Sequence, residues 1–407
     1  SWNPDARNSL SLNLNQGDDY LNFWTKPWKM KNDERSHLNQ QWGNWLVSGR
    51  WNRVISSKLF SENILSFSRY RNKSGMEFSY RENNTNMMIE ALNMASVNDF
   101  SLRSAWKYAL HKNWNMEFGA HAGYLLYRPD YNYLSTSATP QIGNTFRSLE
   151  SALFIDNKIL LSEKLTFQPS LRFSAFSNNG AFFPELEPRV NLSYNINKHH
   201  SINLNYMRVS QSSHLIFAQT ELLKREVWLP ATQVMRPSIS NQASLSWNGS
   251  FANGKFSAES SLYYKRMEHL VSLKEGYENM VGITGIDNKV ETDGRGTAYG
   301  AEFMLKKNTG KWTGSLSYAW SYADRVFSNI NGGKSYEFDY NRPHSIALNA
   351  NRDLRNNWTM SAVWIFQSGT PYTPALSKYY TPDPETGEPL LVIHYGEKNS
   401  ARMQAYH

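Results

Sequence analysis

The stretch Ile202-Asn203-Leu204-Asn205-Tyr206 alternates apolar and polar side chains residue by residue. The same period of two runs through residues 9–15, 243–248 and 345–349. Successive side chains of an extended strand point to opposite faces, so this pattern predicts strands with one apolar and one polar face. Because such segments recur from one end of the chain to the other, we predict an all-β fold.

About 16 such strands are expected along the chain. They are predicted near residues 8–24, 43–56, 58–80, 95–110, 113–128, 146–160, 163–178, 184–197, 199–213, 236–250, 254–277, 294–308, 311–325, 340–354, 357–369 and 390–397. Helical periodicity is scarce. Its best local example, residues 86–92, is interpreted as a turn of helix inside a loop.

Short and long connections alternate between these strands, with one exception, a short link near residues 177–183. Short turns are expected at residues 55–58, 111–113, 157–164, 195–200, 251–255, 307–311 and 354–357. Long segments are expected near residues 25–42, 81–94, 129–145, 214–235, 278–293, 326–339 and 370–389. Outer-membrane barrels have this parity, with tight periplasmic turns and long external loops. The predicted fold class is therefore a transmembrane, antiparallel, up-and-down β-barrel.

The composition of the 407-residue chain agrees with a membrane barrel. Its 14 Trp and 23 Tyr suit the aromatic girdles at the two membrane interfaces. The lack of Cys excludes a disulfide framework and a thiolate zinc site. No apolar run approaches the roughly 20 residues of a membrane-spanning helix. Periodicity alone leaves a soluble β-sandwich open, because its apolar face would be the core.

Several short motifs follow one another in a characteristic order. They are Trp42-Gly43-Asn44, Gly49-Arg50-Trp51-Asn52, Leu186-Glu187-Pro188-Arg189, Val227-Trp228-Leu229-Pro230, Arg236-Pro237, Tyr263-Tyr264-Lys265-Arg266-Met267, the stretch 294–302, Tyr340-Asn341-Arg342-Pro343-His344 and Gly369-Thr370-Pro371-Tyr372. In this order and spacing the chain resembles the barrel domain of TonB-dependent outer-membrane receptors, of the type common in Bacteroidetes. The resemblance extends over residues 1–407.

The resemblance implies a location and a function. Such receptors lie in the outer membrane of Gram-negative bacteria and bind a scarce ligand through long extracellular loops. They import it when the TonB–ExbB–ExbD complex pulls on a plug domain. The expected ligands are metal–siderophore chelates, cobalamin or haem, oligosaccharides, or peptides. Outer-membrane lipid and an accessory surface lipoprotein are further partners to be expected.

The chain also departs from the family pattern. Barrels of this family have 22 strands, so residues 1–407 are expected to be a barrel fragment without the plug and without terminal strands at both ends. Open sheet edges in lipid cost several kcal/mol per unpaired group. We therefore expect the natural protein to be longer, or other pieces to complete its barrel.

No catalytic or metal-binding constellation is recognised in the sequence. Gly294-x-Gly296 is followed by a strand and not by a helix, so it marks a bulge or a close approach and no phosphate loop. His199 and His200 are adjacent and lie in a predicted short turn. Residues 383–388 are interpreted as a solvated acidic loop. We expect no enzyme, no cofactor and no metal.

Recognition is expected on the long loops, where exposed aromatic side chains are candidates to contact a ligand. The candidate ligand-binding residues are Tyr131, Tyr133, His214, Trp228, Tyr277, Tyr336 and Tyr379. The formal charge of +8 is dispersed, which suits lipid headgroups or an anionic ligand and no nucleic acid. Two alternatives stay open: a passive porin-like barrel, and a soluble secreted adhesin or carbohydrate-binding protein.

Overall fold

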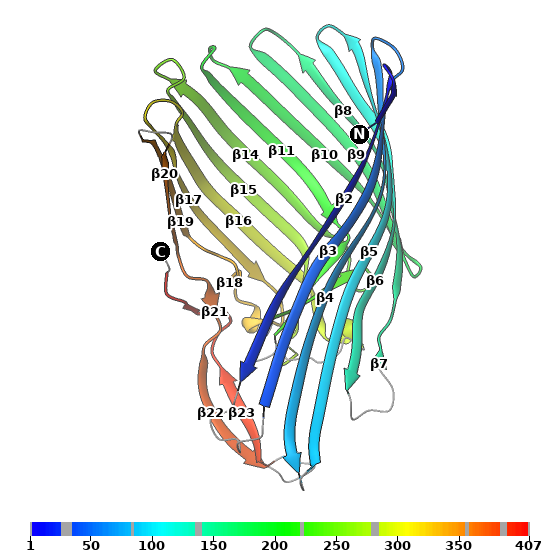
Figure 1. Cartoon of the computed structure of the whole chain (residues 1–407), viewed down its shortest axis with the longest axis vertical. Coiled ribbons are helices and arrows are strands. Elements are labelled where there is room, and N and C mark those ends of the chain that lie inside the picture. The colour runs from blue at the N-terminus through cyan, green and yellow to red at the C-terminus, as the bar shows by residue number, and fades with distance from the viewer. Residues whose placement is uncertain are drawn as a thin grey trace.

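One antiparallel sheet of 18 strands dominates the computed structural model, and it curls into the wall of a barrel (Figure 1). The structure describes residues 2–25, 35–82, 85–134, 141–219, 224–277, 285–354, 358–382 and 389–405. Each long strand of the wall pairs with the next long strand along the chain. This arrangement confirms the predicted all-β, up-and-down architecture.

The wall contains three short strands and fifteen long ones. They are β1 (Trp2–Asp5), β2 (Asn8–Thr25), β3 (Arg35–Val54), β4 (Leu59–Glu82), β5 (Thr85–His111), β6 (Trp114–Leu134), β7 (Gln141–Ile142), β8 (Phe146–Leu160), β9 (Leu165–Asn178), β10 (Ala181–Asn195), β11 (His200–Gln211), β14 (Ser238–Phe251), β15 (Phe256–Leu273), β16 (Val290–Lys307), β17 (Trp312–Val326), β18 (Tyr336–Glu337), β19 (His344–Asp353) and β20 (Thr359–Gln367). Each of the first fifteen predicted ranges overlaps one of the long strands.

Three small two-stranded pieces lie outside the wall. They are β12 (Ser213–Gln219) with β13 (Lys224–Pro230), β21 (Pro371–Tyr372) with β24 (Ala401–Arg402), and β22 (Ala375–Pro382) with β23 (Pro389–Tyr395). The strand predicted near residues 390–397 is β23. It pairs with β22 in a separate hairpin, so its expected place in the wall was wrong.

The interpretation of residues 86–92 as a helical turn was also wrong. The segment belongs to β5, which pairs with β4 along its whole outer part, from Glu82↔Thr85 onward. Its Met, Ile and Leu side chains gave a helix-like local pattern, but the neighbouring strand β4 supplies hydrogen-bond partners that an isolated turn would lack. Consequently the long loop predicted at residues 81–94 is mostly an extension of the β4–β5 hairpin.

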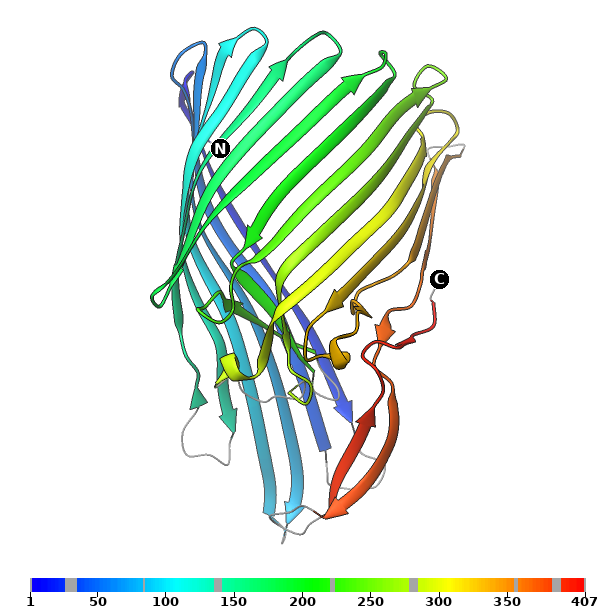
Figure 2. The ribbon, with the colours of Figure 1, turned by 180° about the vertical axis from the view of Figure 1, so that it is seen from behind.

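The short turns gather at one end of the wall and the long connections at the other (Figures 1 and 2). The link between β9 and β10 lies on the long-loop side but is tight. Asn179 and Gly180 there have φ of 45° and 82°, the left-handed geometry of a two-residue hairpin turn. In an outer-membrane barrel the tight-turn end faces the periplasm and the other end faces outward.

The outer surface of the wall is apolar. Leu204, Leu245 and Leu262 are register partners on β11, β14 and β15, and their side chains are 52%, 46% and 57% exposed. Their neighbours along the strands, such as Asn205 and Ser244, point to the lumen. A row of exposed leucines is explained if lipid covers it, so this face is the one that meets the membrane.

The sheet has two edges, with β1 and β2 on one side and β20 on the other, and a wide gap separates β2 from β20 (Figure 1). Among the described residues no backbone pairing joins β20 to β1 or β2. No helix in the described ranges is long and apolar enough to cross a bilayer. The largest buried apolar clusters lie in the layer of long connections and not in the wall.

Candidate functional site

The hairpin β12–β13 leaves the wall after β11 and reaches the wall strands β4–β6. The hydroxyl of Tyr70, on β4, donates to Oε2 of Glu226 at 3.0 Å. The hydroxyl oxygens of Tyr127, on β6, and Ser213 lie 2.5 Å apart. At the base of the hairpin, the side-chain amide of Asn178 donates to the carbonyl of Ala231 at 3.0 Å. The hairpin is therefore fastened to the wall strands β4, β6 and β9.

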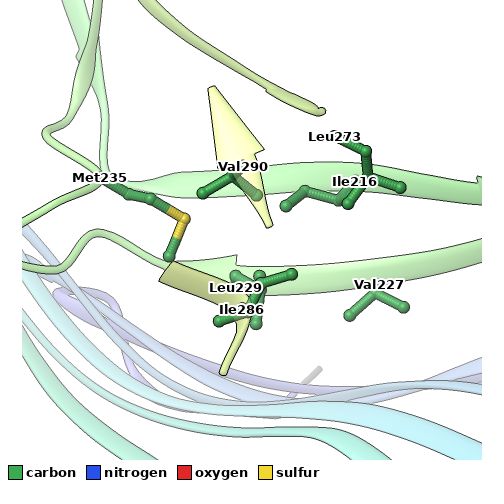
Figure 3. Close-up of a cluster of buried hydrophobic side chains, with 7 residues drawn as sticks. All are labelled: Ile216, Val227, Leu229, Met235, Leu273, Ile286 and Val290. Atoms are coloured by element: carbon green, nitrogen blue, oxygen red, sulfur yellow. The ribbon is translucent and has the colours of Figure 1, made fainter. Parts of the chain in front are cut away.

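An apolar core supports this hairpin from the loop side (Figure 3). Its buried members are Ile216, Val227, Leu229, Met235, Leu273, Ile286 and Val290. They come from β12, β13, the segment before β14, the ends of β15 and β16, and the 3₁₀ turn η1 (Ile286–Asn288) between them. Because Leu229 and Met235 are 0% exposed, the loops pack as a small domain on the end of the barrel.

A second apolar cluster forms where β15 departs from regular pairing. Register shifts follow Glu268 and Leu270, and His269 has φ of 55°, so the strand is bulged there. The bulge places Leu270 against Phe327, with Ile330, Tyr336 and Met267 around them. A Cβ on Gly294 would lie 2.3 Å from the Phe327 ring, so only glycine leaves room for it. The prediction of a close approach at Gly294 is thus confirmed.

The connection from β17 to β19 is held in place by the segment around β24. Arg402 forms an ion pair with Glu337. The side-chain amide of Asn399 donates to Oδ1 of Asp339 at 2.6 Å, and Nζ of Lys334 lies 2.6 Å from Oε1 of Glu397. These polar contacts fix the stretch that carries Tyr336, Phe338, Asp339 and Tyr340, including the turn η2 (Asn331–Gly333).

Between the two clusters and the wall lies a cavity of about 420 Å³. It opens toward the lumen, because Gln211, Ser240, Lys265 and Arg325 belong to the polar faces of their strands. The loops supply the remaining lining, which includes His214, Met267, Phe327, Tyr336, Phe338, Asp339, Tyr340 and Lys398.

Cationic groups and aromatic rings alternate in this lining. The guanidinium carbon of Arg325 lies 3.9 Å from the ring centre of Phe338. Nζ of Lys398 lies 5.9 Å from the ring centre of Tyr336, which in turn stacks on Phe327 at 6.5 Å. Cations over ring faces are held by the ring quadrupole. The lining contains three cations and one carboxylate, that of Asp339, so its formal charge is positive.

Two titratable groups in the cavity keep their neutral forms. Burial lowers the pKa of His214 to about 4, against hydrogen bonding to the backbone of Arg236 and Met235. Burial likewise raises the pKa of Tyr336 to about 12. At neutral pH the cavity therefore presents a neutral imidazole and a protonated phenol, while its charge comes from Lys265, Arg325 and Lys398.

The cavity brings together two of the seven predicted ligand-binding residues, His214 and Tyr336. Trp228 is on β13, where it pairs with Leu215 outside this lining. Tyr277 follows β15 and is 42% exposed. Tyr379 lies on β22, where its hydroxyl and Nε2 of His394 are 3.3 Å apart. The structure does not bring these three to the cavity.

Tyr131 and Tyr133 belong to the outer part of β6 and pair with Met94 and Leu92. Their side chains lie outside the described residues, as does the acidic loop 383–388. They had been expected on a loop, but the backbone continues as a strand to Leu134, because β5 extends equally far and pairs with it.

Sequence reasoning missed the cationic part of the site. The candidates were chosen mainly as aromatic residues on long loops, so Arg325 and Lys265 were not selected. Both lie on the polar face of a strand, close to its long-loop end. Following each polar face to that end would have found them. No group of three or more His, Asp or Glu side chains suited to a metal ion occurs within the ranges that the structure describes.

The fold is similar to those of several known structures. The structure is similar to the ferric-catecholate import receptor Fiu of E. coli K12, with a TM-score of 0.57 and 10% identity over 89% of this chain and 57% of that one. It is also similar to the ferripyoverdine receptor of Pseudomonas aeruginosa, with a TM-score of 0.51 and 8% identity over 96% of this chain and 64% of that one.

A third similar structure is the FrpB iron transporter of Neisseria meningitidis, with a TM-score of 0.51 and 9% identity over 99% of this chain and 73% of that one. The chain thus spans less than two thirds of the first two structures. A search of curated protein sequences finds no significant match. The family model "TonB dependent receptor-like, beta-barrel" matches residues 1–392. The chain therefore belongs to this family of Gram-negative outer-membrane β-barrel proteins.

Proposed function

We propose that the chain is the barrel of an active-transport receptor that binds a scarce ligand through its extracellular loops. The observation that carries this proposal is the cavity between the loop layer and the lumen, where Lys265, Arg325 and Lys398 stand among aromatic rings. A ligand held there has been selected by the loops and already faces the lumen. The family and its structural neighbours, which are transport receptors, support this function.

The chemistry of the lining favours an anionic ligand that carries rings, such as a metal chelate. Arg and Lys supply charge-assisted hydrogen bonds, and Phe338 and Tyr340 supply faces for stacking. Oligosaccharides and neutral peptides would leave the cations without partners. The similar structures named above are receptors for a ferric catecholate and for ferripyoverdine, which supports the same class of ligand.

Import also requires an energy source, and we propose that it is the TonB–ExbB–ExbD complex acting on a plug domain. The family membership of residues 1–392 supports this partner. A passive porin would need an open lumen. The hairpin β12–β13 instead lies inside the described wall, where Glu226 accepts a hydrogen bond from Tyr70 of β4, which favours a gated receptor over a porin.

Equilibrium binding tests the ligand class directly. The protein in detergent is titrated with a ferric tris-catecholate chelate, followed by quenching of intrinsic fluorescence. We expect Arg325→Gln and Lys265→Gln to weaken binding roughly tenfold or more each, because a hydrogen bond to a charged group contributes about 1.5–3 kcal/mol. Lys107→Gln is the matched control, a lumen cation near the tight-turn end.

Two results would contradict the proposal. One is binding by both cavity variants with the affinity of the natural sequence. The other is equal weakening by Lys107→Gln, since a general loss of lumen charge would then account for the effect.

A further inference from the structure

The outer face of β4, β5, β6 and β8 carries two adjacent rows of residues near the long-loop end. Register pairing puts Arg69, Asn98, Leu126 and Arg147 in one row. The next row outward contains Arg71, Ser96 and Arg128. Neighbouring strands are about 4.8 Å apart and diagonal neighbours about 7–8 Å, so Arg128 and Arg147 stand side by side.

These rows are rich in arginine. Arg69, Arg128 and Arg147 are exposed, and none of them forms an ion pair or hydrogen bond with another described residue. Arg71 is different, because its Nη2 lies 2.9 Å from Oδ1 of Asp18. Three arginines on the outer face of the barrel wall therefore have no partner within the part of the chain that the structure describes.

On the membrane side of these arginines, toward the tight-turn end, the same wall forms an apolar groove of about 460 Å³. Its floor is made of small register partners, Ala122, Ser151 and Ala175. Larger side chains surround the floor: Leu65, Phe100, Leu102, Tyr124, Leu149 and Phe182. Leu149 is two residues from Arg147 on β8, so the groove begins next to the arginines.

We propose that this part of the wall is a binding site for a phosphorylated, acylated lipid of the outer leaflet, the lipid A portion of lipopolysaccharide. One phosphate is bound by Arg128 and Arg147 and a second by Arg69, and one acyl chain lies in the groove. Arginine suits this role, because its planar fork donates two parallel hydrogen bonds to a phosphate.

The position of the site identifies the leaflet. The arginines lie at the long-loop end, which faces outward, and the groove lies on the membrane side of them. An apolar floor with a cationic rim matches a lipid whose charge sits above its acyl chains. A soluble anion would gain nothing from the groove, and a protein partner would have to enter the membrane to reach it.

Native mass spectrometry of the full protein in detergent tests this site. The probes are bisphosphorylated lipid A and the same lipid after removal of its phosphates. We expect the triple variant Arg69→Gln/Arg128→Gln/Arg147→Gln to bind bisphosphorylated lipid A roughly 100-fold more weakly, because each arginine near an anionic surface contributes about a factor of five. Ala122→Trp, which fills the floor, should weaken binding at least tenfold with the arginines intact.

Arg53→Gln is the matched control, because Arg53 is an exposed arginine at the tight-turn end, over the ring of Trp51. It should bind like the natural sequence. Heat-dependent gel mobility shows that each variant retains the barrel. The proposal is overturned if the triple variant binds within twofold of the natural sequence, or if the dephosphorylated lipid binds equally well. Displacement of the lipid by millimolar inorganic phosphate would likewise overturn it, since the arginines would then be a site for a free anion.

Discussion

Tyr70 donates a hydrogen bond to Glu226 at 3.0 Å across 156 residues of sequence. One residue stands on the polar face of β4, and the other on the hairpin that leaves the wall after β11. The contact fastens this hairpin to β4 of the wall, so the hairpin is a held part of the structure and not a free loop.

Removing the hydroxyl in Tyr70→Phe should loosen the hairpin without unfolding the wall. A hydrogen bond to a charged group contributes about 1.5–3 kcal/mol, so amides of β12 and β13 should exchange roughly 10- to 100-fold faster. Hydrogen–deuterium exchange measures this. Tyr206→Phe is the control, since that hydroxyl donates to Asn241 on the outer face. Unchanged exchange in Tyr70→Phe would show that the contact does not hold the hairpin.

Truncating the centre of the loop core should disorder the loop layer. Leu229 is 0% exposed, and Leu229→Ala should cost about 2–5 kcal/mol of local stability. Limited proteolysis should then cut the β11–β14 connection first, while heat-dependent gel mobility stays normal. Leu262→Ala, on the lipid face, should leave the proteolysis pattern unchanged. Early loss of the folded barrel in Leu229→Ala would mean that the core supports the wall as well.

The closed loop layer should lose stability in acid. Burial lowers the pKa of His214 to about 4 from its ordinary 6.5, so the released hairpin binds more protons than the closed one between these values. Stability is therefore complete above pH 6.5 and declines as the pH falls toward 4, by on the order of 3 kcal/mol. Hydrogen exchange of β12 across this range gives the measurement. His214→Gln should abolish the pH dependence, and its persistence would assign it to another group.

Gly43 should not tolerate a side chain. A Cβ there would lie 1.9 Å from Oδ1 of Asp18 and 2.6 Å from the backbone carbonyl of Gly17. Gly43→Ala should therefore disturb the Arg71–Asp18 pair and cost about 1–3 kcal/mol, seen as a lower temperature of heat modification. Gly49→Ala, on the same strand with no atom within 4 Å of its Cβ, should be neutral. Equal effects would show that strand propensity and not crowding decides.

The period of two was sufficient to predict the wall, because lipid and lumen impose opposite polarity on alternate residues. It predicted the first and last residues of β2 and β11 to within two residues. It failed at residues 86–92, where the strand extends beyond the membrane and neither face has to be apolar. There β5 is held by pairing with β4, a long-range interaction without a local pattern.

The site was harder to predict than the wall. Tyr336 was found because an aromatic residue on a long loop is conspicuous, and His214 because it follows a strand. Their meeting in one cavity depends on the inward fold of β12–β13 and on the bulge at His269. Neither feature follows from alternation. Arg325 was not predicted, because many cations lie on the polar faces of strands. Only the packing of the loops over that face distinguishes it.

Uptake in living cells tests the central proposal most directly. Cells that carry the full-length protein receive a radiolabelled ferric catecholate chelate, with and without a protonophore that dissipates the proton-motive force. The account predicts uptake that stops with the protonophore and falls at least tenfold in Arg325→Gln. Uptake that continues without the proton-motive force and is unaffected by Arg325→Gln would contradict it and identify a passive pore.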